Sequence, residues 1–228
     1  MTLAQKSFER DLQEIQEELI MMGGMVEKAI STSILALKDL NARLAKEVIR
    51  YDKTIDEQEL KIEDLCIKYI ALQQPKATDL RFITSAMKIN NELERMGDYA
   101  ESIARQALFL SSKPPLKPLV NIPLMSERVQ AMVKDCLTAF LKKDQALAHD
   151  VIHRDHAVDE LQTRIYKNLL GDMIRDPNAI ERASSLLLVS TRLERIADQA
   201  TNVCEDVIYL VTGVTVRHRD KLKLDESS

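Results

Sequence analysis

Four pairs of acidic residues are the part of this sequence whose residue types and spacing indicate chemistry. The two members of each pair are four positions apart, and the pairs are Asp52/Asp56, Glu94/Asp98, Asp155/Asp159 and Glu194/Asp198. Side chains four apart share one face of a helix, where two exposed like charges repel by roughly 0.2–0.5 kcal/mol. A pattern that recurs despite this repulsion indicates that something neutralises the charges.

A bound cation is the first way to neutralise them, and the ligand type restricts its identity. Carboxylate oxygens favour hard ions such as Mg²⁺, Mn²⁺, Ca²⁺ or iron over copper and structural zinc. Two alternatives stay open. Neighbouring acids raise each other's pKa and can remain protonated, and arginines can pair with them. The candidates for such pairing are Arg50, Arg81, Arg95, Arg105 and Arg195.

The remaining reactive residues do not complete a catalytic centre. Di-iron carboxylate enzymes carry a Glu-x-x-His pair, which this sequence lacks. We expect His149, His153 and His156 on the solvated side of a helix. No Gly-rich phosphate loop, nucleophile elbow or Cys-x-x-Cys occurs. The sequence therefore favours a non-enzymatic protein, and a helical-bundle metalloenzyme with a carboxylate-bridged metal cluster is the alternative.

Composition indicates an all-helical protein that does not bind nucleic acid. Only five glycines and six prolines occur among 228 residues, and good helix formers dominate. The formal net charge of −4 and the 4% aromatic content argue against binding phosphate backbones or stacking on bases. Three widely spaced cysteines fit a reducing compartment and buried positions. With no signal-like start and no apolar run of ~18 residues, we expect a cytoplasmic protein.

The sequence contains an internal duplication. The segment VIRYDKTIDE at 48–57 matches VIHRDHAVDE at 151–160 with an offset of 103, and LERMGD at 93–98 matches LERIAD at 193–198 with an offset of 100. Four of the six prolines fall between residues 114 and 123, and a proline-rich segment makes a stiff spacer. We therefore predict a first repeat at 1–112, a linker at 113–123, a second repeat at 124–216 and a charged tail at 217–228.

Each repeat is predicted to be a three-helix bundle. The expected helices cover 3–40, 42–72 and 79–112, and then 125–142, 144–171 and 178–212. Thr78 with Asp79, and Asn178 with Glu181, are predicted to cap the third and sixth helices. Gly23-Gly24 predicts either a kink in the first helix or the close approach of a neighbour. The fold class is all-α, with two tandem bundles joined end to end in an elongated protein.

The helical wheel places the acids beside apolar residues. Asp52 and Asp56 fall in the same arc as Val48, and Asp155 and Asp159 lie similarly in the fifth helix. The acids of the third and sixth helices flank the apolar arc. If the second and third helices of each repeat pack side by side, four carboxylates meet in each half.

The chain resembles the PhoU family over nearly its whole length. The resemblance is carried by LQQPKATDLRFI at 72–83, NNELERMGDYAESIAR at 90–105 and LERIADQATNVCEDVIYLVTG at 193–213. It implies two three-helix bundles related by a pseudo-twofold axis. It also implies a cytoplasmic accessory protein of high-affinity phosphate transport, which represses uptake and phosphate-starvation signalling when phosphate is ample.

The resemblance also implies partners and cofactors. The partners are the ATPase subunit of the phosphate ABC transporter and a phosphate sensor histidine kinase. The membrane is contacted only through them, and a homodimer stays open. The eight acidic residues are implied as metal ligands for multinuclear iron, manganese or magnesium clusters. One departure is that Asn202 follows the second-half motif where the first half has Ser102, which implies metal sites of unequal strength or nuclearity.

Overall fold

The computed structural model describes residues 3–116 and 119–216, with side chains from residue 10 onward, and this part contains only helices and connections. The elements are α1 (Leu3–Lys38), α2 (Ala42–Gln73), α3 (Ala77–Leu110), α4 (Asn121–Lys142), α5 (Gln145–Arg175), the short 3₁₀ helix η1 (Pro177–Ala179) and α6 (Ile180–Thr212). The predicted tail at 217–228 lies outside the described residues. All six predicted helices are present.

The helix starts show both the repeat and two errors of prediction. Asn41 caps α2 by accepting from two backbone N–H groups of the first turn. Asp144, its counterpart at an offset of 103, caps α5 by accepting from the Leu147 N–H. By contrast, α3 begins after Lys76 without a side-chain cap, so the predicted Thr78 and Asp79 cap is wrong. The Asn178–Glu181 capping box is also wrong, because Asp176 accepts from the Asn178 N–H and starts η1 instead.

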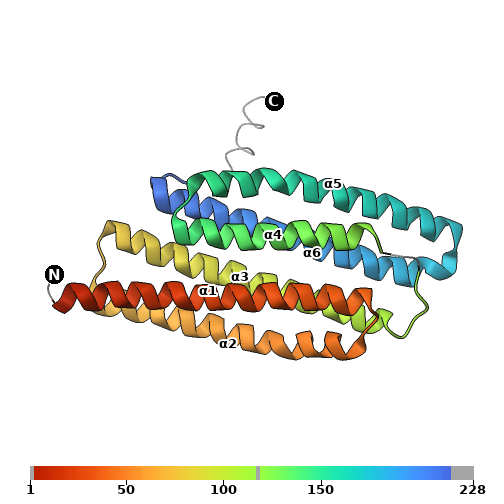
Figure 1. Ribbon diagram of the computed structural model, residues 1–228, viewed down its shortest axis with the longest axis horizontal. Helices are drawn as coiled ribbons and strands as arrows, with labels where there is room; N and C mark the ends of the chain where they lie inside the picture. Colours follow the sequence, from red (N-terminus) through yellow and green to blue (C-terminus); the bar gives the residue numbers. More distant parts are fainter. Residues whose placement is uncertain (1–2, 117–118, 217–228) are drawn as a thin grey trace, which may run out of the picture.

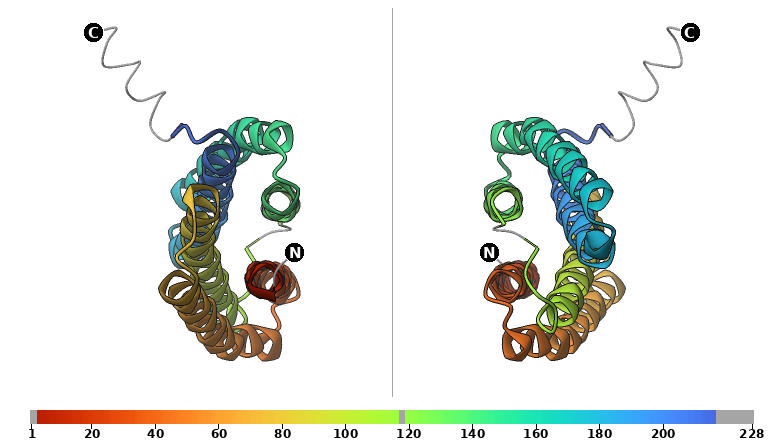
Figure 2. Two further views of the ribbon diagram at one scale, coloured as in Figure 1. Left: turned by 90° about the vertical axis from the view of Figure 1, so that its left-hand side faces the viewer. Right: turned by 90° about the vertical axis from the view of Figure 1, so that its right-hand side faces the viewer.

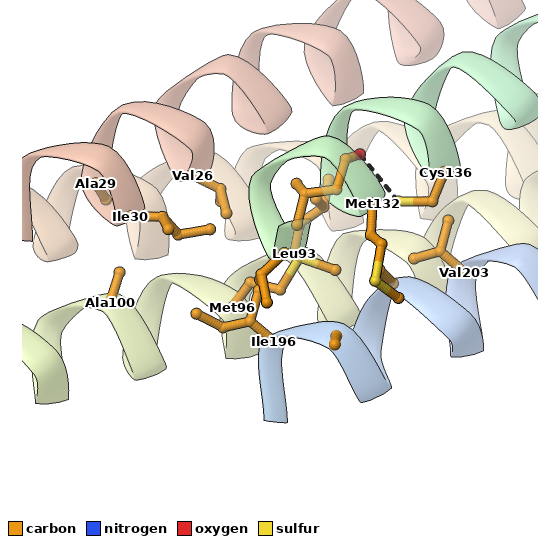
Figure 3. Packing of buried hydrophobic residues seen from close by; sticks show 14 of the residues in the cluster. Val26, Ala29, Ile30, Leu93, Met96, Ala100, Met132, Cys136, Ile196 and Val203 are labelled. Atoms are coloured by element: carbon orange, nitrogen blue, oxygen red, sulfur yellow. Dashed lines mark hydrogen bonds between the residues drawn. The ribbon is translucent and has the colours of Figure 1, made fainter. Parts of the chain in front are cut away.

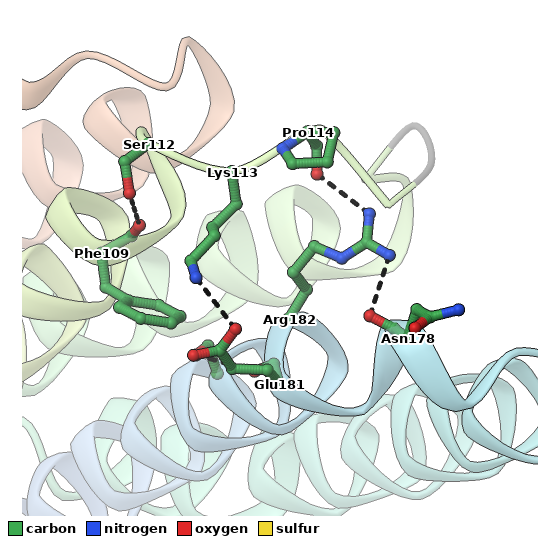
Figure 4. Close-up of polar contacts among 8 residues, drawn as sticks. Phe109, Ser112, Lys113, Pro114, Asn178, Glu181 and Arg182 are labelled. Atoms are coloured by element: carbon green, nitrogen blue, oxygen red, sulfur yellow. Dashed lines mark hydrogen bonds and ion pairs between the residues drawn. The ribbon is translucent and has the colours of Figure 1, made fainter.

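The proline-rich connection is shorter than predicted. Helix α4 begins at Asn121 rather than after residue 123, because a proline in the first helical turn removes only an N–H that has no partner there anyway. The start of the connection is tied to α6 (Figure 4). Lys113 pairs with Glu181 at 3.0 Å, and Arg182 donates to the Pro114 carbonyl at 3.1 Å.

The two halves lie side by side along their lengths, so the expectation that they are joined end to end is wrong (Figure 1). Seen along the long axis, α2, α3, α6 and α5 form a curved layer in that order, and α1 and α4 lie on its inner side (Figure 2). Each half is an antiparallel three-helix bundle, and α3 packs along α6 where the halves meet. The all-α, two-bundle fold class is confirmed.

The halves share one hydrophobic core. Buried side chains from all six helices belong to a single cluster, and Figure 3 shows part of it, with labelled residues from α1, α3, α4 and α6. Phe82 of α3 and Phe140 of α4 stack across the halves with ring centroids 5.6 Å apart. Gly23 also lies against the other half, because a Cβ there would come within 2.3 Å of Leu137 of α4. The glycine pair thus permits a close approach, as one of the two predicted outcomes.

Polar pairs cross the α3–α6 seam and reveal its pseudo-twofold relation. The Asn202 amide donates to the Glu92 carboxylate at 3.4 Å, and Arg192 donates to the Ser102 hydroxyl at 3.0 Å. The two pairs occupy equivalent positions, because Glu92 corresponds to Arg192 and Asn202 to Ser102 at the repeat offset of 100. Such reciprocal contacts are the signature of a twofold interface, here formed within one chain.

Helix α1 contains a long apolar stretch. Its stretch Arg10–Lys38 is long and apolar enough to cross a membrane by length and composition, against the expectation from the sequence. Half of the most apolar window is buried within the protein. Val26 and Ile30 are completely buried among residues of the other helices (Figure 3), so this helix supplies core surface to both halves.

Candidate metal centres between paired helices

The first cluster lies between α2 and α3. Asp52, Asp56 and Asp98 each place one carboxylate oxygen within 4.8 Å of the other two. Gly97 permits this approach, since a Cβ at this position would come within 3.1 Å of Ile55 and 3.5 Å of an Asp52 oxygen. The two helices therefore lie close together where the acids meet.

Burial and mutual repulsion perturb the acids of this cluster. The pKa of Asp52 is raised from 3.8 to about 6, first by burial and then by the charges of Asp56, Asp98 and Glu101. The pKa of Glu94 rises to about 7, again mainly by burial and then by Asp98 and other neighbouring acids. The pKa of Asp98 is also raised, chiefly by burial. These carboxylates hold negative charge at a cost that a cation would relieve.

Two further acids border the first cluster. The charge of Glu59 contributes to the raised pKa of Glu94, and Glu101 contributes to those of Asp52 and Asp98. Glu101 itself forms an ion pair of 2.5 Å with Arg105. The first cluster thus contains more carboxylates than its four motif residues alone.

The second cluster lies between α5 and α6. The pKa of Asp155 is raised to about 6 by burial and then by Asp159, Asp198 and Glu194, so the structure brings these four acids near one another. One oxygen of Asp155 and one of Glu194 are buried without a hydrogen-bond partner in the described part of the chain. Arg195 lies 3.7 Å from Glu194 and 3.5 Å from Asp198.

The position of the acids relative to the apolar face agrees only in part with the helical wheel. Val48, Ile55 and Val151 are buried, whereas Asp52 and Asp155 are half-buried and Asp56 and Asp159 are exposed. The acids therefore lie at the edge of the apolar stripe, where they are half-buried or exposed.

The arginines suggested by the sequence divide into those that contact the acids and those that do not. Arg195 and Arg105 form the ion pairs given above. Arg95 instead hydrogen-bonds Tyr99 and lies 4.0 Å from Glu92, and Arg50 donates to the Lys46 carbonyl. Arg81 lies at the far end of α3, next to Gly213. The charges of Arg105 and Arg95 lower the pKa values of Asp52 and Asp98, but by less than burial and the neighbouring acids raise them, so the arginines offset only part of the negative charge of the first cluster.

Other candidate ligands lie elsewhere. His149, His153 and His156 are exposed on α5, as predicted, and only His156 is close enough to influence the charge of Asp155. Cys66, Cys136 and Cys204 are buried free thiols, also as predicted. Ser102 and Asn202 contact the opposite half, so the inequality that their difference implied would have to arise from other residues.

The donor set fits a hard divalent cation. Carboxylate oxygens from two helices converge, burial and then mutual repulsion raise the pKa of Asp52, and an Asp155 oxygen is buried without a hydrogen bond in the described part of the chain. Such ions accept several carboxylate and water oxygens. Sequence reasoning found the motif acids but missed the role of Gly97. The signal was available, since the small residue directly precedes Asp98 and faces the neighbouring helix.

Comparison with known proteins gives a consistent family. The PhoU domain model matches residues 19–107 and again 122–207. A protein of Aquifex aeolicus named phosphate-specific transport system accessory protein PhoU homolog is 47% identical over 210 residues, covering 92% of this chain and 95% of its own length.

Solved structures agree with the fold. PhoU from Pseudomonas aeruginosa superposes with a TM-score of 0.88 at 36% identity, covering 91% of this chain and 100% of that one. The phosphate transport system regulatory protein PhoU from Streptococcus pneumoniae gives a TM-score of 0.85 at 29% identity, with 92% and 99% coverage. The family model matches both halves separately, which supports the internal duplication.

Proposed function

The chain belongs to the PhoU family, and from this premise we propose that it regulates phosphate transport as a non-enzymatic accessory protein. Its relatives are named accessory or regulatory proteins of the phosphate-specific transport system. In the proposed role, the protein represses phosphate uptake and phosphate-starvation signalling when phosphate is ample. It acts in the cytoplasm on the ATPase subunit of the phosphate ABC transporter and on a phosphate sensor histidine kinase.

The shape of the protein supports an adaptor. Two similar bundles lie side by side on a shared core, so one rigid body offers two related surfaces to two partners. Contact with the membrane would come only through those partners. A homodimer remains compatible with this arrangement, and nucleic acid is not among the expected ligands, since the net charge is −4.

Metal binding is the second part of the proposal. Asp52, Asp56, Glu94 and Asp98 would hold ions in the first half, and Asp155, Asp159, Glu194 and Asp198 in the second. Iron, manganese or magnesium fit the oxygen ligands, in clusters of more than one ion. The observation that carries this part is the convergence of Asp52, Asp56 and Asp98 within 4.8 Å, because three neighbouring carboxylates repel unless a cation lies between them.

The bound ions would supply positive charge and a surface. They would cross-link α2 to α3 and α5 to α6, so that the paired helices move as rigid units. Gly97 and the half-buried Asp52 keep the ligand oxygens close together before an ion arrives. The exposed Asp56 and Asp98 would leave part of the first cluster open to a partner.

The competing interpretation is a metalloenzyme built on the same bundle. It requires substrate access and usually histidine ligands. The three-carboxylate group of the first half contains no histidine, and the family members are named accessory proteins. A turnover assay with iron and oxygen separates the two, since the adaptor predicts no product above the metal-only rate.

The regulatory proposal is tested in cells that lack their own copy of the gene. A phosphate-starvation reporter should be low in phosphate-rich medium with the wild-type chain, and derepressed with the Asp52→Asn/Asp98→Asn variant if the metal part is also correct. Recovery of the transporter ATPase and the kinase by pull-down of the wild-type chain is expected. A wild-type chain that leaves the reporter derepressed would contradict the regulatory role itself.

A further inference from the structure

Arg95 and Arg195 occupy equivalent positions of the repeat but have different contacts. Arg195 lies 3.5 Å from Asp198 and 3.7 Å from Glu194, within its own acidic cluster. Arg95 lies 4.0 Å from Glu92 and hydrogen-bonds Tyr99, and it acts on Asp98 only through its longer-range charge. The guanidinium of Arg192, from the other half, lies over the Tyr99 ring at 5.7 Å. Arg95 is therefore held at the seam between the halves, whereas Arg195 is held at its acidic cluster.

The residues that border the two clusters also differ between the halves. Glu59 and Glu101 flank the first cluster. Their counterparts in the second half, at offsets of 103 and 100, are Gln162 and Thr201. Arg105 pairs with Glu101, and the counterpart of Arg105 at an offset of 100 is Glu205, so the bordering residues carry one net negative charge in each half. The bordering charges therefore do not distinguish the clusters, and any difference must come from the motif acids and the arginines beside them.

The spacing of the motif acids differs between the two halves. In the first half, Asp52, Asp56 and Asp98 already lie within ligand distance of one another. Among the described residues, the corresponding acids of the second half do not form such a group. In that half, the guanidinium of Arg195 lies beside the carboxylates of Glu194 and Asp198.

We propose that the two sites are unequal and that Arg195 causes much of the difference by competing with the cation in the second half. The first site binds a divalent ion directly. The second binds only when the Arg195 guanidinium leaves Glu194 and Asp198, so it fills at higher metal concentration and acts as the responsive site. This inference rests on the proposed metal binding, and it concerns the order of filling rather than the existence of the sites.

The test is a Mn²⁺ titration of the full chain at pH 7.5, followed by calorimetry and by the electron paramagnetic resonance signal of free Mn²⁺. Wild-type protein should show two classes of sites. Asp56→Asn/Asp98→Asn should remove the tighter class, and Asp159→Asn/Asp198→Asn the weaker one. Arg195→Gln should tighten the weaker class about fivefold, as expected for an exposed ion pair worth ~1 kcal/mol. Arg95→Gln is the matched control and should change either class by less than about twofold.

The outcomes separate the inference from its premise. Absence of Mn²⁺ binding to the wild-type chain would overturn both. Two classes of equal affinity, or an Arg195→Gln variant that binds like the wild type while Asp159→Asn/Asp198→Asn still removes one class, would overturn only the inference. Circular dichroism of each variant excludes unfolding as the cause of lost sites.

Discussion

The Lys88 ammonium of α3 donates a hydrogen bond of 3.0 Å to the Asp206 carboxylate of α6, across the seam between the two halves. The Asp206 side chain is 2% exposed, whereas that of Lys88 is 46% exposed and also lies over the Tyr209 ring. A buried carboxylate is thus neutralised by a cation that reaches in from the other half.

This pair predicts that the halves are coupled through charge. Lys88→Met should lower the free energy of unfolding by roughly 1–3 kcal/mol, because removing one partner leaves a buried charge less well neutralised. The double variant Lys88→Met/Asp206→Asn should recover part of the loss. Urea denaturation of the wild type, the two single variants Lys88→Met and Asp206→Asn, and the double variant gives the coupling energy. Additive effects of the two substitutions would contradict the coupling.

The acidic clusters predict a stability that depends on metal. In EDTA, Asp52→Asn should raise the free energy of unfolding by about 1 kcal/mol, because it removes repulsion with several neighbours. With Mn²⁺ at about 100 times its dissociation constant, the order should reverse, since binding adds ~2.7 kcal/mol to the wild type. Thermal or urea denaturation measures both conditions. Glu47→Gln, on α2 outside the cluster, is the control and should show no reversal.

The raised pKa values predict the sign of the pH dependence. Asp52 and Asp155 have a folded pKa of about 6 and Glu94 of about 7, above their ordinary values of 3.8 and 4.5. The folded state therefore binds more protons between these limits, and stability is lost as pH rises through about 6 to 7. In EDTA, the wild type should lose more stability between pH 5 and 7.5 than Asp52→Asn/Glu94→Gln.

That comparison cancels the contributions of titrating groups that lie away from the cluster. An equal pH dependence in the wild type and the double variant would contradict the raised pKa values. With Mn²⁺ present, lowering the pH over the same interval should weaken binding, because protons compete with the ion for the carboxylates.

The adjacent glycines of α1 predict opposite steric outcomes. A Cβ at Gly24 meets no atom within 4 Å, whereas one at Gly23 would come within 2.3 Å of Leu137. Gly24→Ala should stabilise the protein by up to about 1 kcal/mol through helix propensity. The free energy of unfolding of Gly23→Ala should be at least ~1 kcal/mol lower than that of Gly24→Ala, because α1 and α4 must separate or Leu137 must repack. Urea denaturation measures both, and equal stabilities would place α4 farther from α1.

The local features of this protein followed from its sequence. Six helices were predictable because apolar residues recur with helical spacing and prolines mark the connections. The duplication was visible because Asp52 and Glu94 recur as Asp155 and Glu194 in matching surroundings. The four acidic pairs were found for the same reason, since a spacing of four fixes a shared helical face regardless of tertiary structure. The caps were predicted less well, because several polar residues near a helix start compete for the same N–H groups.

The arrangement of the halves was decided only by the tertiary structure. Periodicity shows which face of α3 is apolar, but not that α6 of the other half covers part of it, so the side-by-side packing and the Lys88–Asp206 pair were not predictable. The contacts of Arg95 and Arg195 differ for the same reason, although their local sequences match. A long side chain can reach several partners, and the one it contacts depends on neighbours that are distant in the sequence and brought close only by folding.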